Sequence, residues 1–283
     1  MNTPPLGRVA LLHPGSMGAT IGAALVHTGH TVRWSGEGRS PASHDRARAA
    51  GMVDAGSLVD LLHDVDTVLS VCPPDAAVMV ARQVSELGGA RRYIDANAIA
   101  PETAREIAEI VGFGGGTFVD GGIIGPPAHT AGTTRLYLSG DDAELAAGAF
   151  EGSLVEAIAT DGGAGGASAL KLCYAGWTKG SAALLLTMRS AAESAGVADA
   201  LIAEWERSQP GLVRRSEQTA ASAAPKAWRW VGEMEEIAAF LAAAELPNGS
   251  FAAAAELFAR LEGCKDQVEP PLSLDQVMGQ IRR

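Results

Sequence analysis

The fold is decided by the stretch RVALLHPGSMG, residues 8–18. A short apolar run, typical of a buried strand, leads into a glycine-containing turn, and the residues after it carry the spacing of a helix with one apolar face. Backbone N–H groups at a helix N-terminus, together with the positive end of the helix dipole, attract phosphate oxygens. We therefore expect a dinucleotide to place its pyrophosphate on this turn. The residues expected to contact it are Gly15, Ser16, Met17 and Gly18.

This turn departs from the usual dinucleotide fingerprint. His13 occupies the position of the first glycine, so only Gly15 and Gly18 remain of the three. A residue before proline is biased toward an extended backbone, and Pro14 therefore predicts an extended His13 and a turn of different shape. The alternative is a tight turn that holds no ligand. Its place between a strand and a helix favours the cofactor.

Short β-branched runs alternate with helical patterns through the first half of the chain. This order is typical of a parallel sheet with crossover helices, so we expect a doubly wound Rossmann domain over residues 1–162. The expected strands are residues 8–12, 31–35, 67–72, 93–96, 117–120 and 135–139. The expected helices are residues 17–27, 57–63, 75–87, 102–111 and 142–150.

Small residues dominate residues 159–166, and no convincing strand follows them. We place a domain boundary there and expect an all-helical domain over residues 163–283, which makes the chain an α/β domain followed by an all-α domain. Its first element is a long helix over residues 167–195, where Gly176 and Gly180 would let another backbone approach. Further amphipathic helices are expected over residues 200–208, 212–221, 228–244 and 250–262.

The composition is that of an acidic globular protein. The 283 residues are 47% hydrophobic, enough to bury a substantial core, and 22 Lys and Arg against 33 Asp and Glu give a net charge of −11. That charge repels phosphate backbones and anionic bilayers, so we expect no nucleic-acid or membrane partner. No apolar run approaches the ~18 residues of a membrane span. The widely spaced Cys72, Cys173 and Cys264 indicate free thiols, no metal cluster and a cytoplasmic location.

The end of the second strand selects between the nicotinamide cofactors. An acid there accepts from a ribose 2′-hydroxyl, whereas a cation accommodates a 2′-phosphate. Ser35 ends this strand, and Arg39 and Ser40 offer a charged fork beside a hydroxyl. We therefore predict NADP as the cofactor, while Glu37 is the argument for NAD.

Four further motifs follow the glycine turn in order. They are SVCPP at residues 70–74, DAN at 95–97, FVDGGIIGP at 118–126 and GGASALK at 165–171. With the turn, they resemble the β-hydroxyacid dehydrogenase superfamily, which includes 3-hydroxyisobutyrate dehydrogenases, 6-phosphogluconate dehydrogenase and the imine reductases. The segment WRWVGEM, residues 228–234, is similar to the subgroup with a short phosphogluconate-dehydrogenase-like C-terminal domain.

The resemblance implies reversible hydride transfer between a nicotinamide and a small hydroxy acid or its carbonyl form, with Lys171 as the catalytic lysine. An amine within hydrogen-bond reach of the reacting hydroxyl can carry its proton. The resemblance also places Asn97 beside the nicotinamide. Cys72, Pro73 and Pro74 are then expected on the cofactor, and Gly121, Gly122, Ile123 and Gly125 on the substrate. The alternatives are a solvated surface lysine and, for Asn97, a local turn or helix cap.

Two departures from the family bear on the substrate. Ile124-Gly125-Pro126 replaces the usual serine and two glycines, and Tyr174 stands where asparagine is usual. At i+3, Tyr174 shares a helix face with Lys171, where it would donate to the substrate or assist the proton transfer; packing between domains is the alternative. Imine (C=N) reduction and non-catalytic NADP binding are the competing functions. The retained lysine argues against the imine reductases, which usually carry another residue there.

Large apolar side chains in the C-terminal half favour self-association. They are Trp205, Trp228, Trp230, Phe240, Phe251 and Phe258. A small helical domain with this much apolar surface can pack on a second copy, so we expect a homodimer that acts on a small-molecule substrate.

Overall fold

The computed structural model describes residues 5–283, which divide into two compact units. The first unit ends at Lys171 and the second begins at Leu172, so the division lies inside a helix, beyond the boundary expected after residue 162. In the described part of the chain, no helix is long and apolar enough to cross a membrane.

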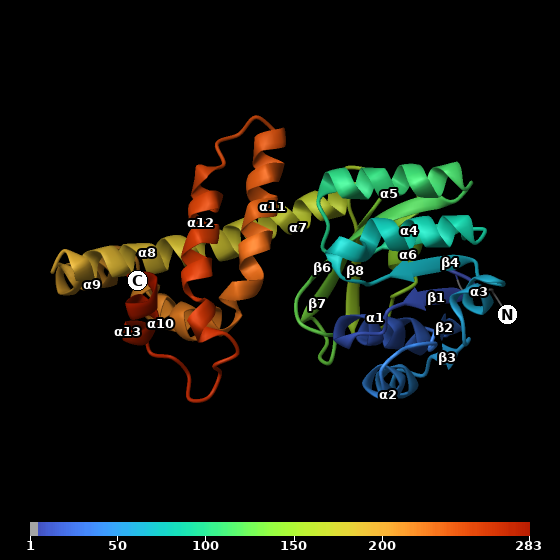
Figure 1. Cartoon of the computed structure of the whole chain (residues 1–283), viewed down its shortest axis with the longest axis horizontal. Coiled ribbons are helices and arrows are strands. Elements are labelled where there is room, and N and C mark those ends of the chain that lie inside the picture. The colour runs from blue at the N-terminus through green and yellow to red at the C-terminus, as the bar shows by residue number, and fades with distance from the viewer. Residues whose placement is uncertain (1–4) are drawn as a thin grey trace. The chain divides into compact units, whose positions relative to one another are not determined.

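The first unit is built on an eight-stranded sheet in the order β3-β2-β1-β4-β5-β6-β7-β8 (Figure 1). Neighbouring strands are parallel except β6 and β7, which are antiparallel. The strands are β1 (Val9–Leu12), β2 (Val32–Trp34), β3 (Val53–Asp54), β4 (Thr67–Ser70), β5 (Arg92–Asp95), β6 (Thr117–Ile124), β7 (Thr134–Ser139) and β8 (Val155–Ala159). This mostly parallel sheet confirms the expected doubly wound architecture.

Helices cover both faces of this sheet. They are α1 (Ser16–His27), α2 (Pro41–Ala49), α3 (Leu58–Leu62), the 3₁₀ turn η1 (Pro74–Ala76), α4 (Ala77–Glu86), α5 (Pro101–Phe113) and α6 (Ala143–Gly148). Alternate strand residues feed two apolar clusters, one shared with α1 and α6 and the other with α3, α4 and α5. Because both faces are covered, the central strands β1, β4 and β5 are buried along their whole length, although β4 and β5 begin and end with polar residues.

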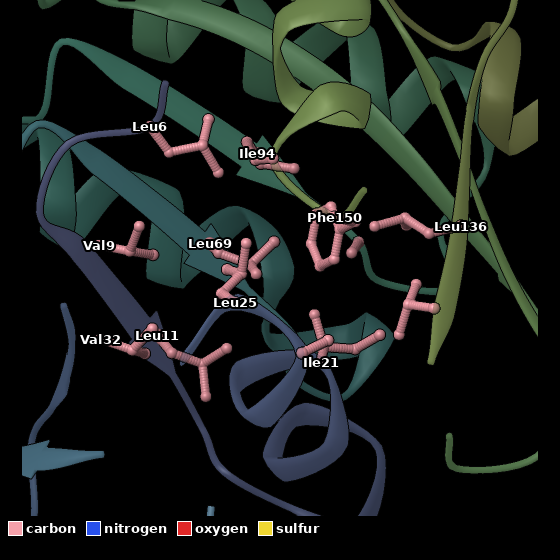
Figure 2. Packing of buried hydrophobic residues seen from close by; sticks show 14 of the residues in the cluster. Leu6, Val9, Leu11, Ile21, Leu25, Val32, Leu69, Ile94, Leu136 and Phe150 are labelled. Carbon is pink, nitrogen blue, oxygen red and sulfur yellow. The ribbon is translucent and has the colours of Figure 1, made fainter. Parts of the chain in front are cut away.

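The larger of these clusters joins the first helix to the far end of the sheet. Ile21 and Leu25 of α1 belong to one cluster with Leu11, Leu69 and other strand residues, and Phe150 lies beside Leu136 (Figure 2). These side chains are fully or almost fully buried. Their burial fixes α1, and therefore the glycine turn that precedes it, against the ends of the strands.

Three elements of the first unit were not expected from the sequence. The helix α2 carries no apolar residue larger than alanine after Pro41, so it shows no apolar periodicity, although Ser40 and Pro41 form an ordinary start signal for it. The strand β3 is only two residues long, and the edge strand β8 carries just one fully buried side chain. Such short or half-exposed strands lack the apolar run that reveals a central strand.

The second unit is helical, as expected. Its elements are the second part of α7 (Gly166–Ala175), a π-helical turn η2 (Gly176–Gly180), α8 (Ser181–Ser194), α9 (Ala198–Ser208), α10 (Leu212–Ala223), η3 (Ala224–Arg229), α11 (Trp230–Ala243), α12 (Gly249–Arg260), η4 (Glu262–Cys264) and α13 (Leu274–Ile281). Gly176 and Gly180 do permit a close approach, but of the Phe251 ring rather than of a backbone: a Cβ on Gly180 would lie 2.9 Å from it. The unexpected α13 begins with a capping box between Ser273 and Gln276.

Candidate functional site

The strand order indicates that a ligand would bind beyond the carboxyl ends of the central strands. The chain runs outward from β1 to β2 and β3, and then returns to place β4 on the other side of β1. In an open parallel sheet, ligands bind beyond the carboxyl ends of the strands where this reversal occurs. The glycine turn follows β1 and the Cys72-Pro73-Pro74 segment follows β4, so both expected cofactor segments flank the reversal.

The turn after β1 is shaped by His13 itself. This residue has a φ of 68°, so it lies in the left-handed region, and the expectation of an extended backbone is wrong. His13 thus takes the conformation for which the fingerprint normally uses glycine, and the Gly15 N–H donates to its carbonyl oxygen at 2.7 Å. That same oxygen would lie 2.6 Å from a Cβ on Gly18, so helix and turn meet where Gly18 has no side chain.

The start of α1 is suited to an anion. No side chain caps this helix, its first turn carries no acid, and a Cβ on Gly15 would meet only open space. Burial, followed by the charge of Arg39, lowers the pKa of His13 to about 4, and its buried Nδ1 has no hydrogen-bond partner among the described residues. These uncapped N–H groups and the orphaned nitrogen fit the pyrophosphate of a dinucleotide.

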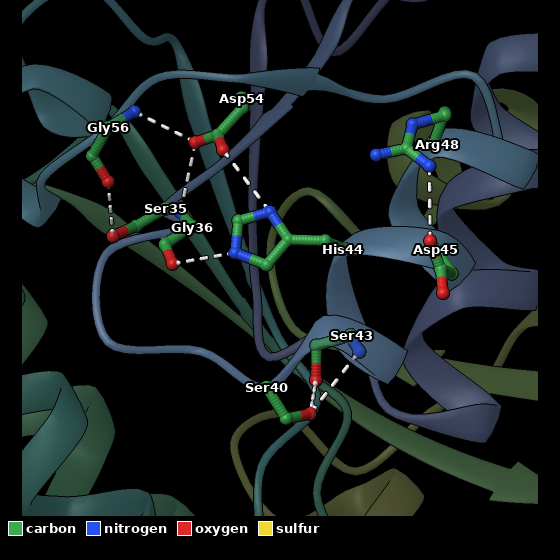
Figure 3. Close-up of polar contacts among 9 residues, drawn as sticks. All are labelled: Ser35, Gly36, Ser40, Ser43, His44, Asp45, Arg48, Asp54 and Gly56. Carbon is green, nitrogen blue, oxygen red and sulfur yellow. Dashed lines mark hydrogen bonds and ion pairs between the residues drawn. The ribbon is translucent and has the colours of Figure 1, made fainter.

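A polar network holds the segment after β2. The backbone N–H groups of Gly36 and Gly56 both donate to Asp54 Oδ1, at 3.0 and 2.9 Å (Figure 3). The His44 ring lies between the Asp54 carboxylate, at 3.6 Å, and the Gly36 carbonyl oxygen, at 3.1 Å. Ser35 also takes part, since its hydroxyl donates to the Gly56 carbonyl oxygen at 2.9 Å.

Arg39 and Ser40 follow the first residues of this network in the chain and precede α2. Arg39 is exposed, and its charge acts on His13, which places the guanidinium near the turn. Ser40 caps α2 by accepting from the Ser43 N–H at 3.3 Å. Arg46 of α2 donates to the Pro14 carbonyl oxygen at 3.1 Å, so α2 is tied directly to the turn.

The segments after β4 and β5 are joined by the Asn97 amide. Its Oδ1 accepts from the Cys72 N–H at 2.5 Å, and its Nδ2 donates to Asp95 Oδ2 at 2.8 Å and to Ser70 Oγ at 3.2 Å. The residue is only 2% exposed. Both amide protons and the amide oxygen are therefore engaged inside the protein.

Asp95 is the most perturbed carboxyl group of the site. It is fully buried and also accepts the Asn97 N–H at 2.9 Å. Burial raises its pKa to about 7; the hydrogen bonds from Asn97 and the charge of Lys171 oppose this rise, whereas the neighbouring Asp120 adds to it. Asp95 and Asp120 end up together because they face each other in the register of β5 and β6.

Lys171 lies beside β6 in this same group. The strand continues past the end of β5 as far as Ile124, and there it pairs only with β7. A Cβ on Gly122 would lie 2.7 Å from the Ala167 carbonyl oxygen and 3.3 Å from the Lys171 Cβ, so α7 rests directly on the strand. Lys171 itself is partly buried.

The residues expected to contact the substrate do not share one kind of structure. Gly121 and Gly122 are buried residues of β6 with negative φ, not loop residues; only Gly125 has a positive φ, of 121°. Ile123 is buried in the same strand. Tyr174 belongs to the second unit, where its side chain is exposed.

Several residues of the site were not identified as functional from the sequence. They are Asp95, Asp120, His44, Arg46 and Asp54. A detectable signal did exist for the first two, because an acid ends each of two consecutive apolar strands. Among residues 5–283, no three His, Cys, Asp or Glu side chains gather closely enough to hold a metal ion.

The raised pKa of Asp95 predicts how its replacement alters stability. The folded protein holds this proton up to about pH 7, whereas an unfolded aspartate releases it near pH 4. Stability therefore falls as pH rises through this window, by up to about 1.4 kcal/mol per pH unit. The Asp95→Asn variant has no carboxyl group at this position, so its free energy of unfolding should lack this decrease. In urea unfolding, the stability of the variant relative to wild type should therefore rise as the pH is raised from 4 to 8. Parallel pH profiles would contradict it.

Known protein families and structures match this chain. A family model described as the NAD binding domain of 6-phosphogluconate dehydrogenase matches residues 8–152, and one described as a domain of unknown function (DUF1932) matches residues 192–261. Probable 3-hydroxyisobutyrate dehydrogenases of Mycobacterium bovis and Mycobacterium tuberculosis are 28% identical over 138 residues. That match spans 47% of this chain and 46% of each relative, about half the length of both.

Solved structures share the fold over almost the whole chain. A conserved protein of unknown function, MTH1747, described as structurally similar to 3-hydroxyacid dehydrogenases, is 27% identical with a TM-score of 0.75, covering 91% of this chain and 97% of its own. The Mycobacterium tuberculosis 3-hydroxyisobutyrate dehydrogenase is 20% identical with a TM-score of 0.75, covering 98% of this chain and 99% of its own. With residues 8–152, half of its length, matched by the first model, this chain belongs to the family of the NAD binding domain of 6-phosphogluconate dehydrogenase.

Proposed function

We propose that this protein is an NADP-dependent oxidoreductase that transfers a hydride between the nicotinamide and a small hydroxy acid or its carbonyl form. The observation that carries the proposal is the position of Lys171. Its amine-bearing helix rests on Gly122, at the same sheet edge as the buried Asp95, Asn97 and the glycine turn. A titratable amine, a perturbed carboxyl group and an anion-binding turn together are typical of a catalytic site.

Lys171 acts as the general acid and base in this proposal. Oxidation of an alcohol requires the hydroxyl proton to leave, and reduction of a carbonyl requires one to arrive. The charge of Lys171 opposes the rise that burial causes in the pKa of Asp95, so the amine and this carboxyl group interact. A bound nicotinamide supplies or accepts the hydride.

Asn97 has a positioning role in this proposal rather than a catalytic one. Its amide has no donor left for a substrate, since both protons go to Asp95 and Ser70. It holds the Cys72 N–H and therefore fixes the start of the Cys72-Pro73-Pro74 segment that we propose to contact the cofactor. Tyr174 remains a proposed donor to the substrate.

The far part of β6 is the proposed substrate edge. Residues 121–124 extend past β5, so on that side the strand has no strand partner. Gly121 and Gly122 have no side chain and Gly125 is exposed, and we propose that the backbone groups of Gly121, Gly122, Ile123 and Gly125 contact the substrate. The curated relatives are named for 3-hydroxyisobutyrate, which makes this small hydroxy acid the first substrate to test.

Replacing Lys171 should abolish turnover and spare cofactor binding. We expect Lys171→Ala to lower kcat by about 10²- to 10⁴-fold, the contribution of one general acid or base. The measurement is nicotinamide absorbance with 3-hydroxyisobutyrate, keto acids, aldehydes and cyclic imines, together with NADPH binding by fluorescence. Lys226→Ala, an exposed lysine of the second unit, is the control.

Other results of this screen would sink the proposed reaction. Turnover of cyclic imines alone would favour C=N reduction. Tight NADPH binding without turnover of any compound, unaffected by Lys171→Ala, would leave a nucleotide-binding protein.

We propose NADP rather than NAD as the cofactor. No acid ends β2: Ser35 stands there, and its hydroxyl proton is used by Gly56. Arg39 lies near the glycine turn, and α2 begins beside it with no acid in its first turn. A cation next to a helix N-terminus suits a 2′-phosphate, and the exposed Glu37 is the only acid in the segment between β2 and α2.

Arg39→Ala should discriminate between the two cofactors. Loss of a hydrogen-bonded charge on the phosphate should raise the Kd for NADPH by about 10- to 100-fold and leave the Kd for NADH within about twofold. Fluorescence titration of both reduced cofactors measures this. The control is Arg48→Ala, since Arg48 lies on α2, the helix that follows Arg39, and pairs with Asp45 (Figure 3). Equal weakening of both cofactors, or tighter NADH binding by wild type, would refute the assignment.

A homodimer through the second unit is also proposed. Trp177 is 70% exposed and Leu184 61% exposed, and they line an apolar hollow of about 560 Å³ with Phe251 and Gly180. Exposed aromatic and aliphatic side chains around such a hollow are typical of an interface.

Light scattering should therefore give twice the chain mass of 29.0 kDa. Leu184→Glu should shift the protein toward the monomer, because it would bury an unpaired charge in the interface. Leu145→Glu places the same charge on an exposed leucine of the first unit and should leave the mass unchanged. A wild-type mass of one chain would exclude the dimer.

A further inference from the structure

The helix that carries Lys171 has no cap from its own sequence. The residues directly before it, 162–165, are three glycines and an alanine, which offer no side-chain acceptor for the first N–H groups. Such groups cost free energy when they are buried without a partner. Acceptors come instead from two strands of the sheet.

Asp120 and Ser139 supply these acceptors from neighbouring strands. The Ser168 N–H donates to Asp120 Oδ2 at 2.8 Å, and the Ser168 hydroxyl donates to Oδ1 at 2.7 Å. The Ala167 N–H donates to Ser139 Oγ at 2.9 Å, and this hydroxyl donates to the Gly163 carbonyl oxygen at 2.7 Å. Asp120 and Ser139 face each other in the register of β6 and β7. We call these two residues, with their hydrogen bonds to the start of α7, the clamp; both of them stand on one pair of hydrogen-bonded strands.

The clamp lies one turn from the reactive amine. Ala167 is four residues before Lys171, and its carbonyl oxygen and the Lys171 Cβ both lie against Gly122. Residues at i and i+4 share one helix face, so fixing the first turn of α7 on β6 also fixes where the Lys171 side chain leaves the helix.

We propose that Asp120, assisted by Ser139, is the positioning residue for Lys171, through its clamp on the first turn of α7. The inference rests on the proposed role of Lys171. Asp120 itself is fully buried and bonded to Ser168, so it does not touch the reacting atoms. Burial raises the pKa of Asp120, while the Ser168 hydrogen bonds oppose this rise, which is the balance expected of a carboxylate held inside the protein by its donors.

The clamp can be tested without a substrate by the reactivity of the Lys171 amine. Each folded variant is treated with an amine-reactive acetyl ester, and peptide mass spectrometry gives the acetylation rate of Lys171 relative to the exposed Lys226. Asp120→Ala should raise this ratio by up to about tenfold, because a lost cap favours the frayed first turn by that factor. Asp120→Asn keeps one acceptor and should return the ratio most of the way to wild type. Ser139→Ala should raise it less than Asp120→Ala.

Kinetics with 3-hydroxyisobutyrate and NADP supply the second measurement. Asp120→Ala should lower kcat by about 10- to 100-fold and leave the cofactor Kd within about twofold, since only the amine is displaced. Ser273→Ala removes a cap of the same kind from α13 and should change neither measurement.

The inference is overturned if Asp120→Ala leaves the Lys171 ratio at the wild-type value, or raises it no more than Ser273→Ala does. Should Asp120→Ala fail to fold, Ser139→Ala decides the outcome by the same ratio: a rise above the Ser273→Ala value supports the inference, and a wild-type value overturns it. A normal kcat in Lys171→Ala would instead refute the proposed function, and the acetylation ratio would still show whether the clamp exists.

Discussion

Three polar residues lie in register on neighbouring strands: Ser70 ends β4, Asp95 ends β5, and Asp120 pairs with Asp95 inside β6. All three are buried, and a buried carboxylate needs hydrogen-bond donors to remain folded at modest cost. Asp95 obtains its donors from Asn97, which orders the segment after β5, and Asp120 obtains them from Ser168, which orders the start of α7. The need to satisfy these groups thus arranges the surrounding backbone.

The glycine turn after β1 is built in a different way from the segments around Asp95 and Asp120. Around the glycine turn, ligand space is created by missing side chains and uncapped N–H groups rather than by paired ones. His13 adopts a left-handed backbone in place of glycine, and its burial lowers its pKa, so it stands neutral beside a site suited to phosphate. The anion-binding turn and the buried acids of β5 and β6 therefore both lie toward the carboxyl ends of the central strands.

The difference between the glycine turn and the region around the buried acids suits the reaction that we propose. The anchored part of a dinucleotide needs only shape and N–H groups, whereas the reacting end needs an amine at a fixed place and in a suitable protonation state. In the first unit, the contact of α7 with Gly122 fixes the place of Lys171, and the buried Asp95 acts on its charge. Gly122 and Asp95 both lie on strands of the sheet and not on a surface loop, and this favours an accurate position for Lys171.

The alternating architecture, the cofactor turn and the family resemblance could be predicted from the residues alone, because apolar periodicity and ordered glycine motifs are local signals. The sequence also placed Lys171 on a helix after a glycine-rich segment. It did not reveal α2, whose polar surface lacks a period, or the strand conformation of Gly121 and Gly122, which depends on pairing with β7. Two sets of contacts became visible only in the folded chain: the side-chain amide of Asn97 makes all its hydrogen bonds inside the protein, and Asp120 and Ser139 cap α7. Most of these contacts join residues 25 to 48 positions apart in the sequence, and no local pattern encodes contacts over such separations.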